Sequence, residues 1–139
     1  MSGQVYDTYV AALQHDIADV PEDAVRVGVV RRPTPWFWAQ VDENVPELGP
    51  PADLLEEFKD RYEALQERGL GDAEAHNTAL ERVDYDDRYK SYLHRSDEAR
   101  AAIATLRTRL ESGEDVVLVC YENTDEKRCH RTLLRSELE

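Results

Sequence analysis

The order of apolar and polar positions along the chain predicts strands near the N-terminus and near residue 118. Residues 5–10 and 24–30 are rich in β-branched and aromatic residues, which are enriched in strands. Residues 115–121 (DVVLVCY) are apolar without alternation, which is the pattern of a strand covered on both faces. Residues 11–19 are compatible with a short helix after the first strand. Gly28 is a candidate for a close approach to another segment.

Helical spacing dominates the rest of the chain. In one segment, apolar residues recur at spacings of 4, 4 and 3 between positions 54 and 65, so they form one stripe on a helix. Asp53, Asp72 and Ser96 are candidate N-caps, because short polar side chains accept hydrogen bonds from the first turn. The predicted helices are 53–68, 72–83, 96–111 and 129–138, with a tyrosine-rich and partly helical stretch at 84–93.

The segment 33–51 is predicted to be a loop, because prolines interrupt it repeatedly. Structureless loops of this length are uncommon and often functional. It contains Trp36, Phe37 and Trp38. We favour an interpretation in which these aromatic residues anchor the loop to the core. The alternative is a stacking surface for a ligand that carries a ring.

The succession of elements predicts a single α/β domain over residues 1–139, in which helices flank a small and mostly parallel sheet. The strand order cannot be read from the sequence. In open α/β sheets, ligands bind beyond the carboxyl ends of the strands. Two polar stretches meet that condition: Arg31 and Arg32 follow one strand, and residues 120–131 follow another.

The charge balance is strongly acidic. Thirty acidic residues face 17 basic ones, giving a formal net charge of −13, and only Lys59, Lys90 and Lys127 are lysines. Such a composition is typical of proteins from salt-loving organisms, where salt screens the self-repulsion of the chain. Because the nucleic-acid backbone is itself a dense anion, we expect no direct binding to a duplex.

The distribution of apolar residues and cysteines indicates a compartment. The sequence contains no run of 18 apolar residues and no basic stretch followed by an apolar one at its beginning, so we expect neither a membrane span nor a secretory signal. Two cysteines in such a chain favour a cytoplasmic protein with reduced thiols. The oligomeric state is not indicated.

Both cysteines lie in one segment, Val117–Leu134 (VLVCYENTDEKRCHRTLL). Cys129, His130 and Arg131 fall at the predicted start of the last helix. A helix N-terminus and a nearby cationic side chain both lower the pKa of a thiol, and free amides at a helix start bind anions. Neighbouring residues on a helix point in different directions, so contact between Cys129 and His130 does not follow from their adjacency.

This segment resembles the C-terminal signature of the domain-of-unknown-function 488 family, in which a strand ending in Cys-x-Glu precedes a Cys-His-Arg that opens the final helix. The stretches VYDTYVAAL, VVRRPTPWF and PELGPPADLLEEFK resemble other segments of the family. The resemblance supports the fold and implies a site, but it names no reaction. The residues it implies are Thr8, Tyr9, Arg31 or Arg32, Pro35, Trp36, Cys120, Glu122, Cys129, His130 and Arg131.

Four interpretations of the cysteine segment remain open. The first is a pocket with an activated Cys129, and the second is a zinc site formed by Cys120, Glu122, Cys129 and His130, although the spacing fits no familiar zinc motif. The third is a reversible Cys120–Cys129 disulfide. The fourth is a purely structural role, which we prefer for Cys120 as a small buried residue.

We therefore expect a site at the carboxyl ends of the strands that binds or converts a small anionic ligand; whether the protein is an enzyme is open. The alternative is a non-enzymatic binding or adaptor module, in which the Cys-His-Arg motif is a structural clasp. No metal is assigned and the cofactor is unknown. The expected catalytic residues are Cys129, His130 and Glu122. The expected ligand-binding residues are Arg131, Arg31, Arg32, Trp36, Tyr9 and Cys120.

Overall fold

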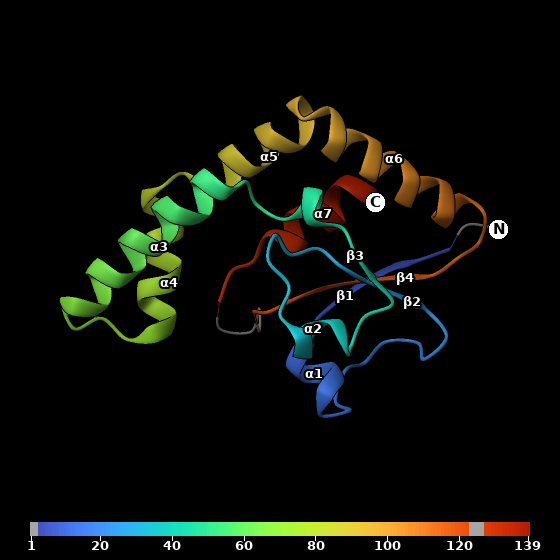
Figure 1. The fold of residues 1–139 in the computed structure, drawn as a ribbon, viewed down its shortest axis with the longest axis horizontal. Helices are drawn as coiled ribbons and strands as arrows, with labels where there is room; N and C mark the ends of the chain where they lie inside the picture. Colours follow the sequence, from blue (N-terminus) through green and yellow to red (C-terminus); the bar gives the residue numbers. More distant parts are fainter. Residues whose placement is uncertain (1–2, 123–126) are drawn as a thin grey trace.

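A four-stranded parallel sheet forms the centre of the protein in a computed structural model that describes residues 3–122 and 127–139 (Figure 1). All three neighbouring pairs of strands are parallel. The α/β prediction is therefore confirmed, and the strand order that the sequence left open is β1-β4-β2-β3. The strands are β1 (Val5–Tyr9), β2 (Val25–Gly28), β3 (Glu43–Asn44) and β4 (Val116–Cys120).

Strand β4 lies inside the sheet and all five of its residues are buried. Its side chains alternate between two apolar clusters. Val116 and Leu118 pack in one cluster, and Val117 and Val119 pack in the other. The apolar run without alternation thus reflects a strand that helices cover on both faces, as predicted.

Helices cover both faces of the sheet (Figure 1). One face carries the short helices α1 (Val10–Gln14) and α2 (Pro35–Trp38). The other carries the longer ones, and the hairpin formed by α3 and α4 projects beyond the carboxyl ends of the strands, as Figure 1 shows. The remaining helices are α3 (Ala52–Glu67), α4 (Asp72–Arg82), α5 (Tyr85–Arg95), α6 (Asp97–Glu111) and α7 (His130–Leu138).

Helix caps follow the prediction at one position out of three. Ser96 precedes α6, and its hydroxyl accepts a hydrogen bond from the amide of Ala99 at 3.2 Å. Asp53 and Asp72 are not caps, because the N-cap positions belong to Pro51 and Gly71. Both acids lie in the first turn instead, where a negative charge interacts favourably with the helix dipole.

The predicted loop 33–51 is wrong in part, because it contains α2, β3 and a 3-10 turn at Pro46–Leu48. Strand β3 forms through its backbone: the amide of Asp42 donates to Arg26 O at 2.9 Å, and that of Val45 to Gly28 O at 2.8 Å. The close approach at Gly28 is confirmed. A Cβ atom there would lie 2.5 Å from the Phe37 ring.

The three aromatic residues of this segment divide into two groups. Phe37 is fully buried and anchors the segment, as predicted. Trp36 and Trp38 remain 45% and 48% exposed, so the anchoring interpretation is wrong for them. The Trp36 ring lies beside Tyr121, with 5.9 Å between the ring centroids.

None of the helices in the described part of the chain combines the length and the apolar character that crossing a bilayer needs.

Candidate functional site

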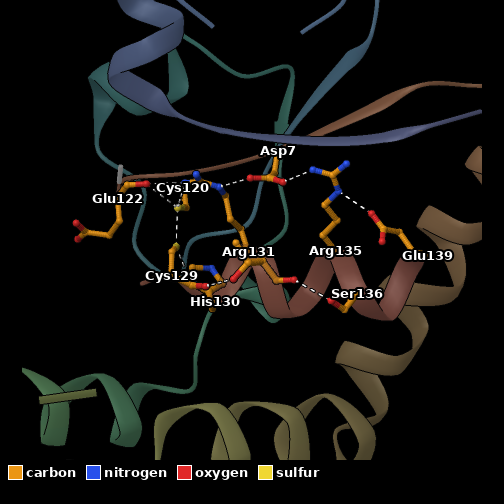
Figure 2. Close-up of polar contacts among 10 residues, drawn as sticks. Asp7, Cys120, Glu122, Cys129, His130, Arg131, Arg135, Ser136 and Glu139 are labelled. Atoms are coloured by element: carbon orange, nitrogen blue, oxygen red, sulfur yellow. Dashed lines mark hydrogen bonds and ion pairs between the residues drawn. The ribbon is translucent and has the colours of Figure 1, made fainter. Parts of the chain in front are cut away.

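Two thiols meet where β4 ends and α7 begins. Cys120 is the last residue of β4, and Cys129 is the N-cap residue of α7. Their sulfur atoms lie 2.6 Å apart, and both cysteines are free and buried (Figure 2). The fold therefore brings together the only two cysteines of the sequence.

The His130 ring is oriented by a backbone carbonyl. Its Nε2 atom lies 2.5 Å from Val29 O, and its Nδ1 atom lies 3.5 Å from Cys129 Sγ. Because a carbonyl oxygen only accepts, Nε2 carries the hydrogen, and Nδ1 of the neutral ring is free to accept from the thiol. Burial lowers the pKa of His130, which favours this neutral form.

Arg131 is buried among protein groups and only 2% exposed. Its Nη1 atom donates to Cys120 Sγ at 2.9 Å and to Glu122 O at 2.6 Å, and its Nε atom donates to Asp7 Oδ1 at 2.9 Å. Asp7 also accepts from Arg135 Nη1 at 2.6 Å (Figure 2). Burial opposes ionisation of Asp7, but hydrogen bonds from both arginines lower its pKa overall.

The two thiols are shifted in opposite directions. Burial raises the pKa of Cys120 well above its ordinary value, and the neighbouring Cys129 raises it further. Burial also disfavours the thiolate of Cys129. It is outweighed by hydrogen bonds from Cys120 and from the Arg131 amide and by the Arg131 charge, so that the pKa of Cys129 is lowered. Cys129 is therefore the thiol that ionises first.

A cavity of about 180 Å³ opens beside the two thiols. The α3–α4 hairpin contributes an apolar wall that includes Leu55, Phe58 and Leu80. The strand ends contribute the side of the cavity that contains the two thiols. The other lining residues are Val30, Arg31, Arg32, Pro50, His76, Tyr85, Cys120, Tyr121, Glu122, Arg128, Cys129 and His130.

A sequence model of the DUF488-N3a family, described as the active DUF488-N3 subclade, matches residues 9–139. The chain belongs to this family. The match confirms the resemblance that the Cys-x-Glu and Cys-His-Arg motifs indicated. No curated protein and no solved structure matched the sequence.

Six of the predicted site residues line the cavity of this DUF488 protein, and three do not. Arg131 is directed at protein groups. Tyr9 ends β1 as the register partner of Cys120, and Trp36 packs on Tyr121 outside the lining. The six that line the cavity are Arg31, Arg32, Cys120, Glu122, Cys129 and His130.

Two of the lining residues use their polar groups elsewhere. Arg31 donates to the carbonyls of Pro50 and Gly49 at 3.0 and 3.2 Å, and to Tyr92 Oη at 3.0 Å. The Glu122 carboxylate lies 3.6 Å from Lys127 Nζ and points away from the thiols in Figure 2. Its main-chain carbonyl, not its carboxylate, contacts Arg131.

Sequence reasoning missed Asp7 and His76. Asp7 lies 124 positions from Arg131, and no local pattern pairs residues so far apart. His76 is buried and lines the cavity. Its Nε2 atom lies 2.8 Å from Arg128 O. Its position four residues before Leu80, on the buried face of α4, was the available signal.

Within residues 3–122 and 127–139, no group of three or more His, Cys, Asp or Glu side chains is arranged to hold a metal ion. The four residues of the zinc interpretation do not gather as a set, because the Glu122 carboxylate turns toward Lys127.

Proposed function

We propose that this DUF488 protein is an enzyme that uses Cys129 as a nucleophile on a small ligand carrying an anionic group. The observation that carries the proposal is the contact between Cys129 Sγ and His130 Nδ1 at the wall of the cavity. The description of the matching subclade as active agrees with this proposal.

The arrangement has the three parts of an activated nucleophile. A thiol lies within reach of a base, and a third group orients the base. Here the third group is the Val29 carbonyl, which holds His130 with Nδ1 toward Cys129. The neutral ring accepts the thiol proton, and the resulting imidazolium is positioned to return it to a leaving group.

Arg131 acts in this proposal as a positioning residue. Its guanidinium holds Cys120 Sγ from one side, and Cys120 in turn contacts Cys129. The positive charge of Arg131 favours the thiolate of Cys129. The predicted role of Arg131 as a direct anion ligand is less well supported, because its donors are already engaged with Asp7, Cys120 and Glu122.

The size and lining of the cavity support a ligand with one small apolar part. An apolar cavity of about 150 Å³ is enough to bind benzene, and this cavity of about 180 Å³ has an apolar wall. We therefore propose that the part inside is about the size of a single ring. Phe58, Leu80 and Tyr85 would contact it.

Arg32 is the best-placed residue for the anionic part. It is exposed and lines the cavity. Among residues 3–122 and 127–139, no hydrogen-bond or ion-pair partner is found for its guanidinium. Arg128 also lines the cavity, but it pairs with Asp86 at 2.6 Å. An arginine without a partner in the described part of the chain is notable where the net charge is −13, because acidic side chains are abundant.

The competing function is a structural clasp without catalysis. Arg131 joins Asp7 of β1, Cys120 of β4 and its own helix α7, and such a network stabilises the last helix on the sheet whether or not a ligand binds. The clasp predicts unreactive thiols, whereas the enzyme predicts a reactive one.

The proposal is tested with two alkylating reagents of similar size and different charge. Iodoacetate carries a carboxylate and iodoacetamide is neutral. We expect Cys129 to react with both, and we expect the ratio of the iodoacetate rate to the iodoacetamide rate to exceed that for free glutathione. Cys129→Ser should abolish the fast reaction, and Cys120→Ser should retain it.

The matched pair of arginine variants isolates the anion site. Arg32→Gln should lower the iodoacetate rate several-fold and leave the iodoacetamide rate nearly unchanged. Arg68→Gln removes an exposed arginine outside the cavity lining and should change neither rate. If both thiols resist iodoacetamide at neutral pH, the nucleophile proposal is wrong and the clasp explains the motif. If the Arg32 variant behaves like the Arg68 variant, the anion site lies elsewhere.

A further inference from the structure

We infer that Cys120 is the resolving thiol of Cys129, and that a hydroperoxide converts the pair into a reversible disulfide that switches the site off. The inference rests on the proposed nucleophilic role of Cys129 and adds its regulation. It assigns a chemical role to the cysteine that the sequence alone indicated to be a small buried residue.

The geometry of the two thiols carries the inference. Their sulfur atoms lie 2.6 Å apart in the free state, so little movement is needed before they bond. Both are on ordered elements, since Cys120 ends β4 and Cys129 caps α7. Both also line the cavity, through which a reagent as small as hydrogen peroxide reaches Cys129.

The first step oxidises Cys129. Its thiolate attacks one oxygen of the hydroperoxide, so that an S–O bond forms and the O–O bond breaks. The sulfur becomes a sulfenic acid, and the departing oxygen takes up a proton and leaves as water or an alcohol. Susceptibility to this step follows thiolate character and access, which select Cys129 over the more fully buried Cys120.

The second step uses Cys120. Its sulfur attacks the sulfenic sulfur, so that the S–S bond forms, the S–O bond breaks, and the hydroxyl leaves as water with the proton of Cys120. Arg131 Nη1 lies 2.9 Å from Cys120 Sγ and stabilises the negative charge that develops there as the proton departs. In total, one hydroperoxide is reduced and two thiols are oxidised. A dithiol reductant reverses the bond by exchange.

The disulfide inactivates the site and also protects Cys129 from irreversible oxidation. A sulfenic acid that meets no thiol proceeds to the sulfinic acid, which most cells cannot reduce. Because the thiol of Cys120 is in direct contact with Cys129, it reacts with the sulfenic acid before a second oxidation occurs. While the disulfide persists, Cys129 has no thiolate with which to attack a ligand.

The experiment treats the full-length protein with hydrogen peroxide in fixed high salt, blocks free thiols, and measures intact and peptide masses under non-reducing conditions. We expect the wild type to form one intramolecular Cys120–Cys129 disulfide that dithiothreitol reverses completely. Cys120→Ser should instead accumulate sulfinic acid at Cys129, roughly tenfold above the wild type, because no thiol intercepts the intermediate. Cys120→Ala serves as a second variant if the serine disturbs the strand end.

Two outcomes would overturn the inference. One is that the wild type reaches sulfinic acid as fast as the Cys120 variants. The other is that any disulfide links two protein molecules. Alkylation of Cys120→Ser by iodoacetamide, measured without peroxide, reports separately on the nucleophile. Fast alkylation of Cys120→Ser together with no disulfide in the peroxide-treated wild type would remove the resolving role alone. No alkylation of Cys120→Ser and no oxidation of the wild type would remove both proposals.

Discussion

Two arginine networks fasten helices to the sheet at its opposite ends, and they differ in burial. Near the amino end of β4, Arg109 pairs with Glu43 at 2.6 Å and with Glu114 at 2.9 Å, and the three side chains are 23%, 44% and 36% exposed. Toward the carboxyl end, Arg131 pairs with Asp7 at 2.9 Å, and these side chains are only 3% and 13% exposed.

The comparison shows how burial changes what one residue type does. Around Arg109, water and salt screen the charges, so each ion pair adds little. Around Arg131, the buried guanidinium cannot exchange its partner for water, and removal of Asp7 leaves it without a counter-charge. The same low-dielectric setting lets the Arg131 charge act on the neighbouring thiols. A buried ion pair that holds a helix on the sheet can thus also lower the pKa of a neighbouring nucleophile.

The largest expected effect comes from removing one acid from each network. Asp7→Asn should lower the free energy of unfolding by roughly 3–5 kcal/mol, because it leaves Arg131 buried without its counter-charge. The matched variant Glu43→Gln should cost less than about 1 kcal/mol, since its ion pair is more open to solvent, with side chains 44% and 23% exposed. Chemical denaturation at one fixed salt concentration measures both.

The pH dependence of this difference has a defined sign. The pKa of Asp7 is lowered in the folded protein, so the native state binds fewer protons than the unfolded state in acid. The contribution of Asp7 is present at neutral pH and is lost as the pH falls through its lowered pKa. Equal losses in the two variants at neutral pH would contradict the contrast between the networks.

The next largest effect is on the reactivity of Cys129, which lies beside the buried Arg131 network. His130→Asn should slow iodoacetamide alkylation of Cys129 at neutral pH at least tenfold, because a positioned base contributes ~10²–10⁴-fold. Arg109→Lys, in the less buried network at the other end of the sheet, should leave the rate unchanged. His130→Gln provides a second variant. A rate that is insensitive to His130 would show that the base is not involved.

The smallest expected effect is at Glu122. Its carboxylate lies 3.6 Å from Lys127, with side chains 33% and 22% exposed, and its carbonyl is the atom that contacts Arg131. Glu122→Gln retains that carbonyl, so it should change stability by less than about 1 kcal/mol and alkylation by less than twofold. A large loss of reactivity would restore the catalytic role that the sequence motif suggested for this carboxylate.

The elements could be predicted wherever one local pattern decided them. Helix α6 shows both a cap and an apolar stripe, and β4 shows an unbroken apolar run, so their predicted bounds differ from the observed ones by one residue at most. Strand β3 could not be predicted, because Glu43 and Asn44 carry no strand signal. Their pairing with β2 depends on where the preceding chain places them.

The candidate site was predictable in its members more than in its geometry. The motif brought Cys129, His130 and Arg131 into consideration, but adjacency on a helix did not show that His130 Nδ1 faces the thiol. That orientation depends on Val29 O, 101 positions away. The counter-charge of Arg131 was missed for the same reason, since Asp7 lies on a strand at the other end of the sequence.

The most direct test of the nucleophile is a pH titration of the thiolate absorbance in Cys120→Ser, which retains Cys129 as its single cysteine and a hydroxyl donor beside it. We predict a pKa for Cys129 in the folded protein below the value found for the same variant in denaturant. With that sign, the ionised thiol stabilises the fold above the unfolded pKa, and this contribution is lost as the pH falls through the folded one. A folded pKa equal to or above the denatured value would contradict the activated thiolate at the centre of this account.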